Sequence, residues 1–426
     1  MRLARGPLAL IAFIIIASPV EAIDLPKIHG FAETAYGFRT RHNDTTKHNT
    51  YNLCEQRIQL KSSYSPNIPI LKDMYTEFNY KGDLVIDEYD QGKVRYNIRE
   101  ANLSLSPLGW MDVKLGRQVF TWGTGDYLFV NDVFPKDYVS FFIGRDDEYL
   151  KKPSDGVRVS GFTKLANADF ILIPFFEANT VAQGDRLSFY DMFQSGIAGR
   201  ESERALREPS LKPNNSELAG RLYRNFGSYE TALYAFKGHY RNPIGTKMEQ
   251  RRVLFYPRLN VYGGSIRGPA LGGIGSIELG YYDSDEDRGG RKRHIPNSTL
   301  RWFIGYEKDL GDDLRVGLQY YYEQMIQYGR YKTSRLAADP VNEEINHRVT
   351  LRITKLAMKQ TFRATLFAFY SPVEEDFYIR PVGEYDITDQ WKLTMGANII
   401  WGDENNSEFG QMRKNSNIYA RLRYSF

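Results

Sequence analysis

Strict alternation of apolar and polar residues recurs along this sequence almost from end to end, and it restricts the possible folds more than any other feature. Residues 314–322, LRVGLQYYY, put every second side chain on an apolar face, and residues 300–306, 349–353 and 391–397 alternate in the same way. Side chains on a β-strand have a period of two, so each segment presents one apolar face and one mostly polar face. The pattern predicts an all-β chain.

About eighteen such segments can be counted, and sixteen is the nearest alternative. Each has roughly the length that a tilted strand needs to cross a bilayer. A mean hydropathy of −0.49 is compatible with this interpretation, because only every second residue of a membrane barrel has to be apolar. The strands are expected to start near Ile28, Tyr51, Met74, Val94, Met111, Gly156, Ala168, Leu218, Tyr229, Val253, Gly272, Thr299, Leu314, His347, Thr361, Phe377, Trp391 and Ser416.

The connections between these segments alternate between short and long. Tight turns such as 106–109 and 225–228 follow every second strand, and long connections separate the others; the short 371–375 is an exception. Transmembrane barrels have short periplasmic turns and long external loops, and an even number of strands places both termini in the periplasm. We therefore expect an antiparallel up-and-down barrel whose longest external loops are 123–154 and 177–216.

Both ends of the chain support an outer-membrane destination. Residues 1–22 combine the basic Arg2 and Arg5, an apolar stretch and a small residue at Ala22, which is typical of a cleaved secretory signal. The mature barrel is then expected to span residues 23–426. The last strand ends in Phe426, which resembles the signal that the bacterial barrel-assembly machinery recognises. The barrel is then expected to be surrounded by outer-membrane lipid and lipopolysaccharide. A soluble β-sandwich is the disfavoured alternative fold.

Arginine is frequent in the predicted strands and is expected to face the lumen, because a lipid-facing arginine costs about 2–4 kcal/mol at mid-membrane. The phase of the alternation puts Lys61, Lys114 and Lys392 on this face together with Arg57, Arg158, Arg221, Arg258, Arg301, Arg315, Arg348, Arg352, Arg363, Arg380, Arg421 and Arg423. Fewer acids share it: Glu33, Glu55, Glu100, Asp112, Glu307, Glu323 and Glu384.

This basic excess of about two to one would concentrate anions in a low-dielectric pore. The alternative is that the arginines pair with the acids and brace the wall of the barrel. Both interpretations stay open, because an error of one residue in register moves a side chain to the other face.

One strand departs from its own alternation. Met111, Val113 and Leu115 face outward, and the same phase would put Arg117 in lipid; a bulge at Gly116 would turn it inward. The long connection that follows is rich in aromatic residues, so we expect it to fold into the barrel and narrow the pore rather than cap the outer rim. The predicted constriction comprises Arg117, Trp122, Tyr127, Phe129 and Phe134.

Residues 115–123, LGRQVFTWG, followed by 127–132, YLFVND, resemble a segment of alginate-export-type barrels. They are also similar to a segment of a related family of proteobacterial outer-membrane barrels with a GRQ motif. The resemblance covers about twenty residues. It implies a barrel whose basic lumen passes a polyanionic polysaccharide.

The function that these patterns favour is passive passage of small or polymeric hydrophilic solutes, with anions preferred, through a porin-like channel. A scaffold barrel that sheathes a periplasmic or secreted partner is the alternative, and a barrel lipase or protease is the least favoured. We expect no enzymatic activity, since His239 and His347 lie near strand ends without a serine placed beside them. No cofactor, metal or nucleic-acid partner is expected: CxxCH, P-loop and HExxH motifs are missing from the sequence, and the formal net charge is only +4.

Overall fold

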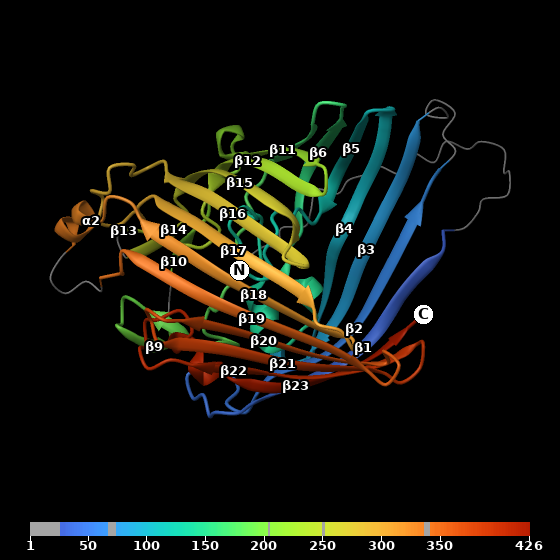
Figure 1. The fold of residues 1–426 in the computed structure, drawn as a ribbon. Coiled ribbons are helices and arrows are strands. Elements are labelled where there is room, and N and C mark those ends of the chain that lie inside the picture. The colour runs from blue at the N-terminus through green and yellow to red at the C-terminus, as the bar shows by residue number, and fades with distance from the viewer. Residues whose placement is uncertain (1–25, 67–73, 203–204, 249–251, 336–340) are drawn as a thin grey trace.

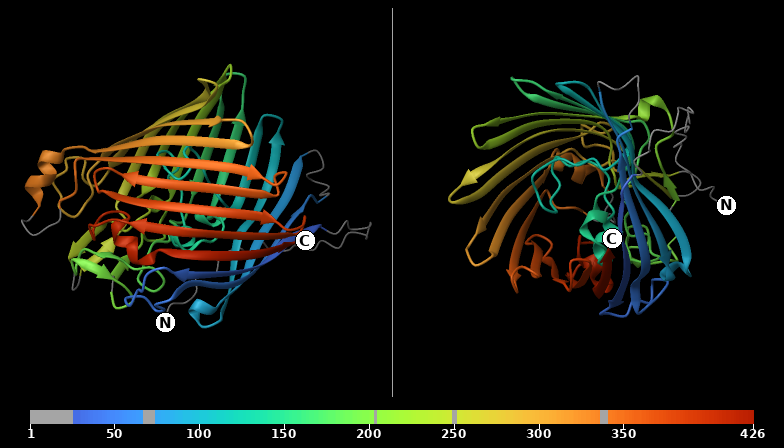
Figure 2. Two further views of the ribbon diagram at one scale, coloured as in Figure 1. Left: turned by 60° about the horizontal axis from the view of Figure 1, so that its bottom comes forward. Right: turned by 90° about the vertical axis from the view of Figure 1, so that its right-hand side faces the viewer.

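A computed structural model describes residues 26–66, 74–202, 205–248, 252–335 and 341–426. The predicted signal, 1–22, lies outside the described residues. The described chain forms a closed antiparallel β-barrel of eighteen strands, which confirms the predicted fold class and strand number. Figure 1 shows the strands running obliquely around the cylinder, and the right-hand view of Figure 2 looks into it from one end.

The strands follow one another around the barrel in sequence order, and the last pairs with the first. In that order they are β1 (Ile28–Arg39), β2 (Tyr51–Tyr64), β3 (Tyr75–Asp87), β4 (Lys93–Leu108), β5 (Met111–Gln118), β6 (Ser154–Phe162), β7 (Asn167–Ile173), β11 (Glu217–Phe226), β12 (Tyr229–His239), β15 (Arg258–Ala270), β16 (Gly273–Ser284), β17 (Thr299–Asp309), β18 (Leu314–Met325), β19 (Ile345–Ala357), β20 (Phe362–Ser371), β21 (Asp376–Asp386), β22 (Trp391–Trp401) and β23 (Asn417–Ser425).

One expected strand start was wrong. We expected a barrel strand from Val253, but β14 (Arg252–Phe255) belongs to a small three-stranded sheet with β13 (Gly245–Met248) and β10 (Ala205–Arg207). The barrel strand begins only at Arg258. Pro257 separates the two alternating stretches, because proline cannot donate a hydrogen bond to a sheet ladder. The sequence pattern shows alternation on both sides of this proline, but it does not show that the two stretches belong to different sheets.

The two faces of the wall differ as the alternation predicts. Along β2, Glu55, Arg57 and Gln59 are buried within the barrel, whereas the intervening Ile58 and Leu60 are exposed on its outer surface. The same contrast holds on β12, where Leu233 is 65% exposed. An apolar outer surface and a polar inner one are the arrangement of a cylinder that stands in a hydrocarbon medium.

Long and short connections also alternate between the two ends. At one end lie tight turns such as 109–110, 163–166 and 227–228, and at the other lie the longer loops. The loops carry the remaining elements: η2 (Glu88–Asp90), α1 (Tyr138–Ile143), η3 (Asp147–Leu150), β8 (Phe189–Asp191), β9 (Gly196–Ala198), η4 (Pro213–Asn215), α2 (Tyr328–Ser334) and η5 (Gly410–Asn415). Within the described residues, no helix has the length and apolar character needed to span a membrane.

The connection between β5 and β6, residues 119–153, runs inside the barrel, where Figure 2 shows it as a teal coil within the ring of strands. We call it the inner segment. Its apolar side chains join inward-facing side chains of the wall in two buried clusters. One is centred on Phe141 and Phe369 and the other on Phe134 and Tyr234. The barrel therefore encloses a packed core made of its wall and its own longest aromatic loop.

Candidate functional site

The inner segment is fixed to the wall near its start by one carboxylate. Glu278, on the inner face of β16, is 1% exposed. It accepts hydrogen bonds from the backbone amides of Thr124 and Asn131, the latter at 3.2 Å, and from the Asn131 side-chain amide at 3.1 Å. A buried carboxylate is stable only where it is hydrogen-bonded or paired. These bonds hold both ends of residues 124–131 against β16.

The C-terminal part of the inner segment packs against β1 to β4 through a network of buried charges. Arg57 on β2 lies 3.0 Å from both Glu55 and Asp83, and its guanidinium stacks over the ring of Tyr149 from the inner segment. Arg145 of the segment donates to Glu55 at 2.7 Å. Buried ions persist only when they are paired in this way. This half of the lumen is filled.

The inner segment also reaches the seam where the first and last strands meet. Asp146 lies 3.1 Å from Arg421 and 2.9 Å from Arg423, both on β23, and Arg423 donates to Glu33 on β1 at 2.8 Å. Burial opposes ionisation of Asp146, but the two guanidinium groups outweigh it and lower the pKa of its carboxyl to about 2. Asp146 is therefore charged at neutral pH and ties the segment to both seam strands.

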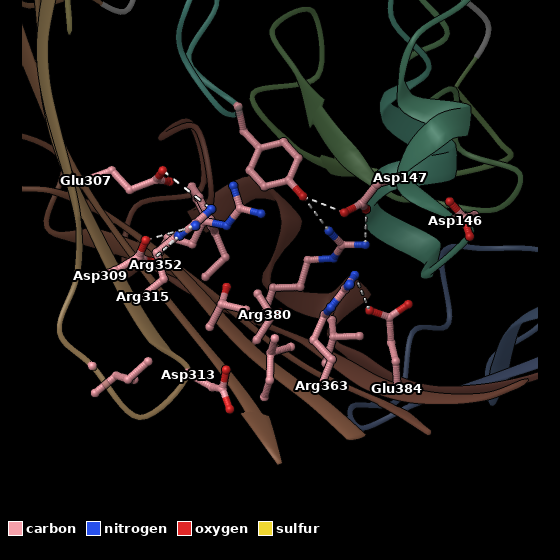
Figure 3. A pocket seen from close by; sticks show the side chains of 18 of the residues that line it. Asp146, Asp147, Glu307, Asp309, Asp313, Arg315, Arg352, Arg363, Arg380 and Glu384 are labelled. Carbon is pink, nitrogen blue, oxygen red and sulfur yellow. Dashed lines mark hydrogen bonds and ion pairs between the residues drawn. The ribbon is translucent and has the colours of Figure 1, made fainter. Parts of the chain in front are cut away.

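A cavity of about 690 Å³ remains between the inner segment and strands β17 to β21, with Arg421 of β23 also in its lining. Figure 3 shows charged side chains converging on it from the wall and from the segment. Among the described residues, its lining includes the five arginines Arg315, Arg352, Arg363, Arg380 and Arg421 and the six acids Asp146, Asp147, Glu307, Asp309, Asp313 and Glu384. The cavity is polar and nearly balanced in charge.

The narrowest contacts between the segment and this part of the wall centre on Tyr127. Its hydroxyl donates to Asp147 at 2.5 Å and accepts from Arg380 at 3.3 Å, and its ring meets Phe367 edge-on with centroids 4.6 Å apart. Beside it, Asp126 of the segment pairs with Arg352 at 2.8 Å. Burial and the neighbouring Asp147 carboxylate raise the pKa of the Tyr127 hydroxyl, so it stays a neutral donor. These groups close one side of the cavity.

Eleven of the twelve arginines predicted to line the lumen share the inner face of the wall, and each lies within 4.0 Å of a carboxylate. Their partners come from neighbouring strands or from the loops. The pairs are Arg57 with Glu55 and Asp83, Arg158 with Asp169, Arg221 with Glu230, Arg301 with Glu323, Arg315 with Glu307 and Asp309, Arg348 with Glu408, Arg352 with Asp126, Arg363 with Glu384, Arg380 with Asp147, and Arg421 and Arg423 with Glu33 and Asp146.

Arg258, the twelfth, lies on the same face of β15 as Tyr262, and Tyr262 is 53% exposed on the outer surface. Its guanidinium donates to the side chain of Asn215 in η4 at 3.1 Å, outside the barrel wall. The expected lumenal position fails because the barrel strand starts five residues later than predicted, and Arg258 is its first residue.

Arg117 also differs from its expected position. The register of β5 runs without a shift against β6 from Met111 to Gln118 and against β4 from Val113 to Arg117, so the predicted bulge at Gly116 is missing from this strand. Arg117 stays on the outer face with Leu115 and pairs with Asp155 on β6 at 3.2 Å. Its Nε donates to the carbonyl oxygen of Ile98 at 2.7 Å. The irregularity lies on β4, where the register with β3 shifts at Lys81 and Gly82.

The other four residues of the predicted constriction all lie on the inner segment. Tyr127 lines the cavity, whereas Trp122 and Phe134 contact each other and pack against the wall beneath β12, with Trp122 5.8 Å from the ring of Tyr234. Phe129 packs against the other core cluster. Most of the aromatic residues therefore fix the segment in place, and Tyr127 alone of these four faces the cavity.

The sequence reasoning missed the acids that hold the segment. Asp126, Asp146 and Asp147 were treated as loop residues, and Glu278 was not singled out on its strand. The available signal was a run of acids in a loop that follows an arginine-rich series of strands. The loop is predicted to enter the lumen and carries acids, whereas the wall carries arginines. This opposite charge would have indicated that the loop acids pair with the wall arginines.

Comparison with known proteins supports the fold. No protein-family model and no curated protein sequence matches the chain. Among solved structures, Acinetobacter baumannii OccAB3 aligns with a TM-score of 0.54 at 9% identity over 94% of this chain and 99% of the other. Pseudomonas aeruginosa OccK5 gives 0.54 at 10% over 94% and 97%, and Pseudomonas aeruginosa OccK11 gives 0.53 at 9% over 94% and 96%. At such low identity the likeness concerns the barrel fold alone.

Proposed function

We propose that this chain is a porin-like channel of the bacterial outer membrane that passes small hydrophilic solutes passively. The single observation that carries the proposal is the polar cavity of about 690 Å³ inside a cylinder whose outer surface is apolar. Such a cylinder removes every sheet edge and shields a hydrated interior from hydrocarbon. The inner segment reduces the lumen to a path along β17 to β21, with Tyr127 at its narrow point.

The proposed orientation places the tight turns and both termini in the periplasm and the long loops outside the cell, as short turns and long loops are placed in bacterial barrels. Phe426 ends the last strand on the outer surface, where it is 47% exposed and accessible to the barrel-assembly machinery. Lipid and lipopolysaccharide would surround the apolar face. This orientation makes the cavity near Arg363 open toward the periplasm.

Two arginine side chains of the cavity lining favour an anionic solute as the cargo. Arg352 and Arg363 have side chains 40% and 56% exposed, more than the Asp126 and Glu384 carboxylates with which they pair at 30% and 26%. Exposed guanidinium groups in a narrow, low-dielectric path attract anions and form bidentate hydrogen bonds with carboxylates. A segment of an acidic polysaccharide fits the same chemistry, as the resemblance of residues 115–132 to alginate-export-type barrels implies.

Purified protein in a planar bilayer under a salt gradient tests both parts of the proposal. Discrete conductance steps are expected, with a reversal potential that reports anion preference. The double variant Arg352→Gln and Arg363→Gln should shift that potential toward the value of a non-selective pore. Arg224→Gln is the matched control, because Arg224 lies on the outer face and donates to the Leu165 carbonyl.

The possible results of these recordings test the channel and its anion preference separately. A protein that inserts but never conducts refutes the channel. A reversal potential that favours cations, or one that the double variant does not change, refutes the anion preference while leaving the channel intact. Deleting residues 127–142 tests the narrowing separately, because conductance should rise once the inner segment no longer crosses the lumen.

A further inference from the structure

A patch of polar groups lies on the outer surface of the barrel, level with the middle of β3 and β4 and at the loop ends of the shorter β5 and β6. It consists of Tyr80 on β3, Tyr96 on β4, Arg117 on β5 and Asp155 on β6, and we call it the outer polar patch. The hydroxyls of Tyr80 and Tyr96 both lie over Gly82 and fill the space that a side chain would take there. Arg117 pairs with Asp155 at 3.2 Å, and the two side chains remain 21% and 40% exposed.

The patch is not at the rim of the wall formed by β3 and β4. Beyond it, toward the long loops, Leu84 and Val94 are 42% and 64% exposed on the same face. On the other side, toward the tight turns, Leu103 and Val113 continue the outward-facing apolar pattern. Ala101, directly paired with both Tyr80 and Arg117, fixes the height of the patch within this apolar band. Charged groups at this height, unless covered, face hydrocarbon, which disfavours them.

We propose that a second copy of this chain covers the outer polar patch, so that two barrels associate side by side about a two-fold axis normal to the membrane. This inference rests on the proposed membrane location. All copies enter the membrane in one orientation, so the patch of one barrel lies at the same depth as the patch of the next. Any other partner would need matching polar groups at this depth.

The patch is also complementary to itself. Tyr80 and Arg117 flank Ala101 on opposite sides, so a two-fold rotation about an axis near Ala101 brings the Arg117 guanidinium of one copy toward the hydroxyl of Tyr80 of the partner subunit. The two phenolic hydroxyls donate as well as accept hydrogen bonds. The small Ala101 at the centre of the patch allows two walls to approach closely, as small residues do between membrane-embedded elements. On the outer face of β17 to β19, Ile304, Leu318 and Leu351 are aliphatic. The polar groups beside them, Tyr320 and His347, hydrogen-bond each other and form no ion pair of the Arg117–Asp155 kind with the described residues.

Disulfide trapping in membranes tests the arrangement. In a Cys54→Ser background, Ala101→Cys should give a cross-linked dimer on mild oxidation, because the two-fold axis passes near this residue. Ile304→Cys is the matched control on the opposite outer face, where it is 50% exposed, and should remain monomeric. Light scattering of wild-type protein in lipid nanodiscs should give twice the monomer mass.

The double variant Arg117→Leu and Asp155→Leu should lose the Ala101→Cys cross-link by at least tenfold and still conduct in a planar bilayer. If this variant does not insert, Arg117→Gln with Asp155→Asn removes the charges while keeping similar shapes. Monomeric wild-type protein, or equal cross-linking at positions 101 and 304, overturns the proposal. A conducting monomer would refute the association alone, whereas a chain that neither inserts nor conducts would refute the proposed function.

Discussion

Replacing Glu278 by alanine is expected to release the start of the inner segment while the barrel stays closed. The carboxylate accepts from the backbone amides of Thr124 and Asn131 and from the Asn131 side chain, and it is almost completely buried. The variant leaves both amides inside the barrel without this acceptor. The pairing of β16 with β15 and β17 uses backbone groups only, so the wall does not depend on this side chain.

The magnitude follows from the three hydrogen bonds. A hydrogen bond to a charged group contributes about 1.5–3 kcal/mol, and at the lower end three of them contribute about 4 kcal/mol. Each 1.4 kcal/mol corresponds to a factor of about ten in an equilibrium constant, so the undocked population of residues 124–131 should rise roughly a thousandfold. Glu278→Gln keeps one acceptor oxygen without the charge and should give about half of the free-energy loss.

Hydrogen–deuterium exchange of the folded protein in detergent measures this effect at the amides of residues 124–131. The alanine variant should exchange roughly a thousandfold faster there, a factor that follows from the three bonds lost, and single-channel recordings should show excess open-channel noise. Strand amides of β16 serve as the internal control and should stay protected. Exchange at Thr124 and Asn131 within tenfold of wild type would refute the role given to this carboxylate.

Three further expectations follow from other sites. Burial and the nearby Glu408 carboxylate raise the pKa of Glu374 to about 7, so its contribution to docking of residues 402–416 is complete below pH 4.5 and disappears as the pH rises through about 7. The protection factors of amides in this loop, which are corrected for the intrinsic pH dependence of exchange, should fall across that range and stay constant in Glu374→Gln. Gly144 ends α1 with φ 86° against the ring of Tyr419, so Gly144→Ala should destabilise the protein by about 1–2 kcal/mol in denaturant unfolding. Phe426→Ala should reduce the amount of assembled barrel in the outer membrane severalfold, with total synthesis as the control.

The strands could be predicted from the sequence because each depends on a local period of two. The start of β2 at Tyr51 and of β18 at Leu314 follows directly from alternation, and so does the inward phase of Arg57 and Arg352. The misplaced start near Val253 arose because Pro257 divides two alternating stretches. Alternation shows the face of a strand, but it carries no information about the sheet that the strand joins.

The interior was harder to predict because it depends on contacts between distant residues. The phase of β5 correctly points Arg117 outward, but the cost of an unpaired arginine in lipid favours a bulge that the strand does not contain. Asp155 resolves the problem, but it is paired with Arg117 only through the register of β6, 38 residues later. In the same way the basic excess of the lumen disappeared once loop acids such as Asp147 were placed beside the wall arginines.

Closure of the cylinder also completes one charge cluster, and this has a consequence for the order of assembly. Glu33 belongs to the first strand, Arg421 and Arg423 to the last, and Asp146 to the inner segment. If the segment were still outside when the seam closed, the two neighbouring arginines on β23 would share Glu33 as their one remaining counter-ion in this cluster. Closure of the barrel is thus favourable only when the inner segment already lies in the lumen. The charges at the seam therefore couple closure to a correctly filled interior.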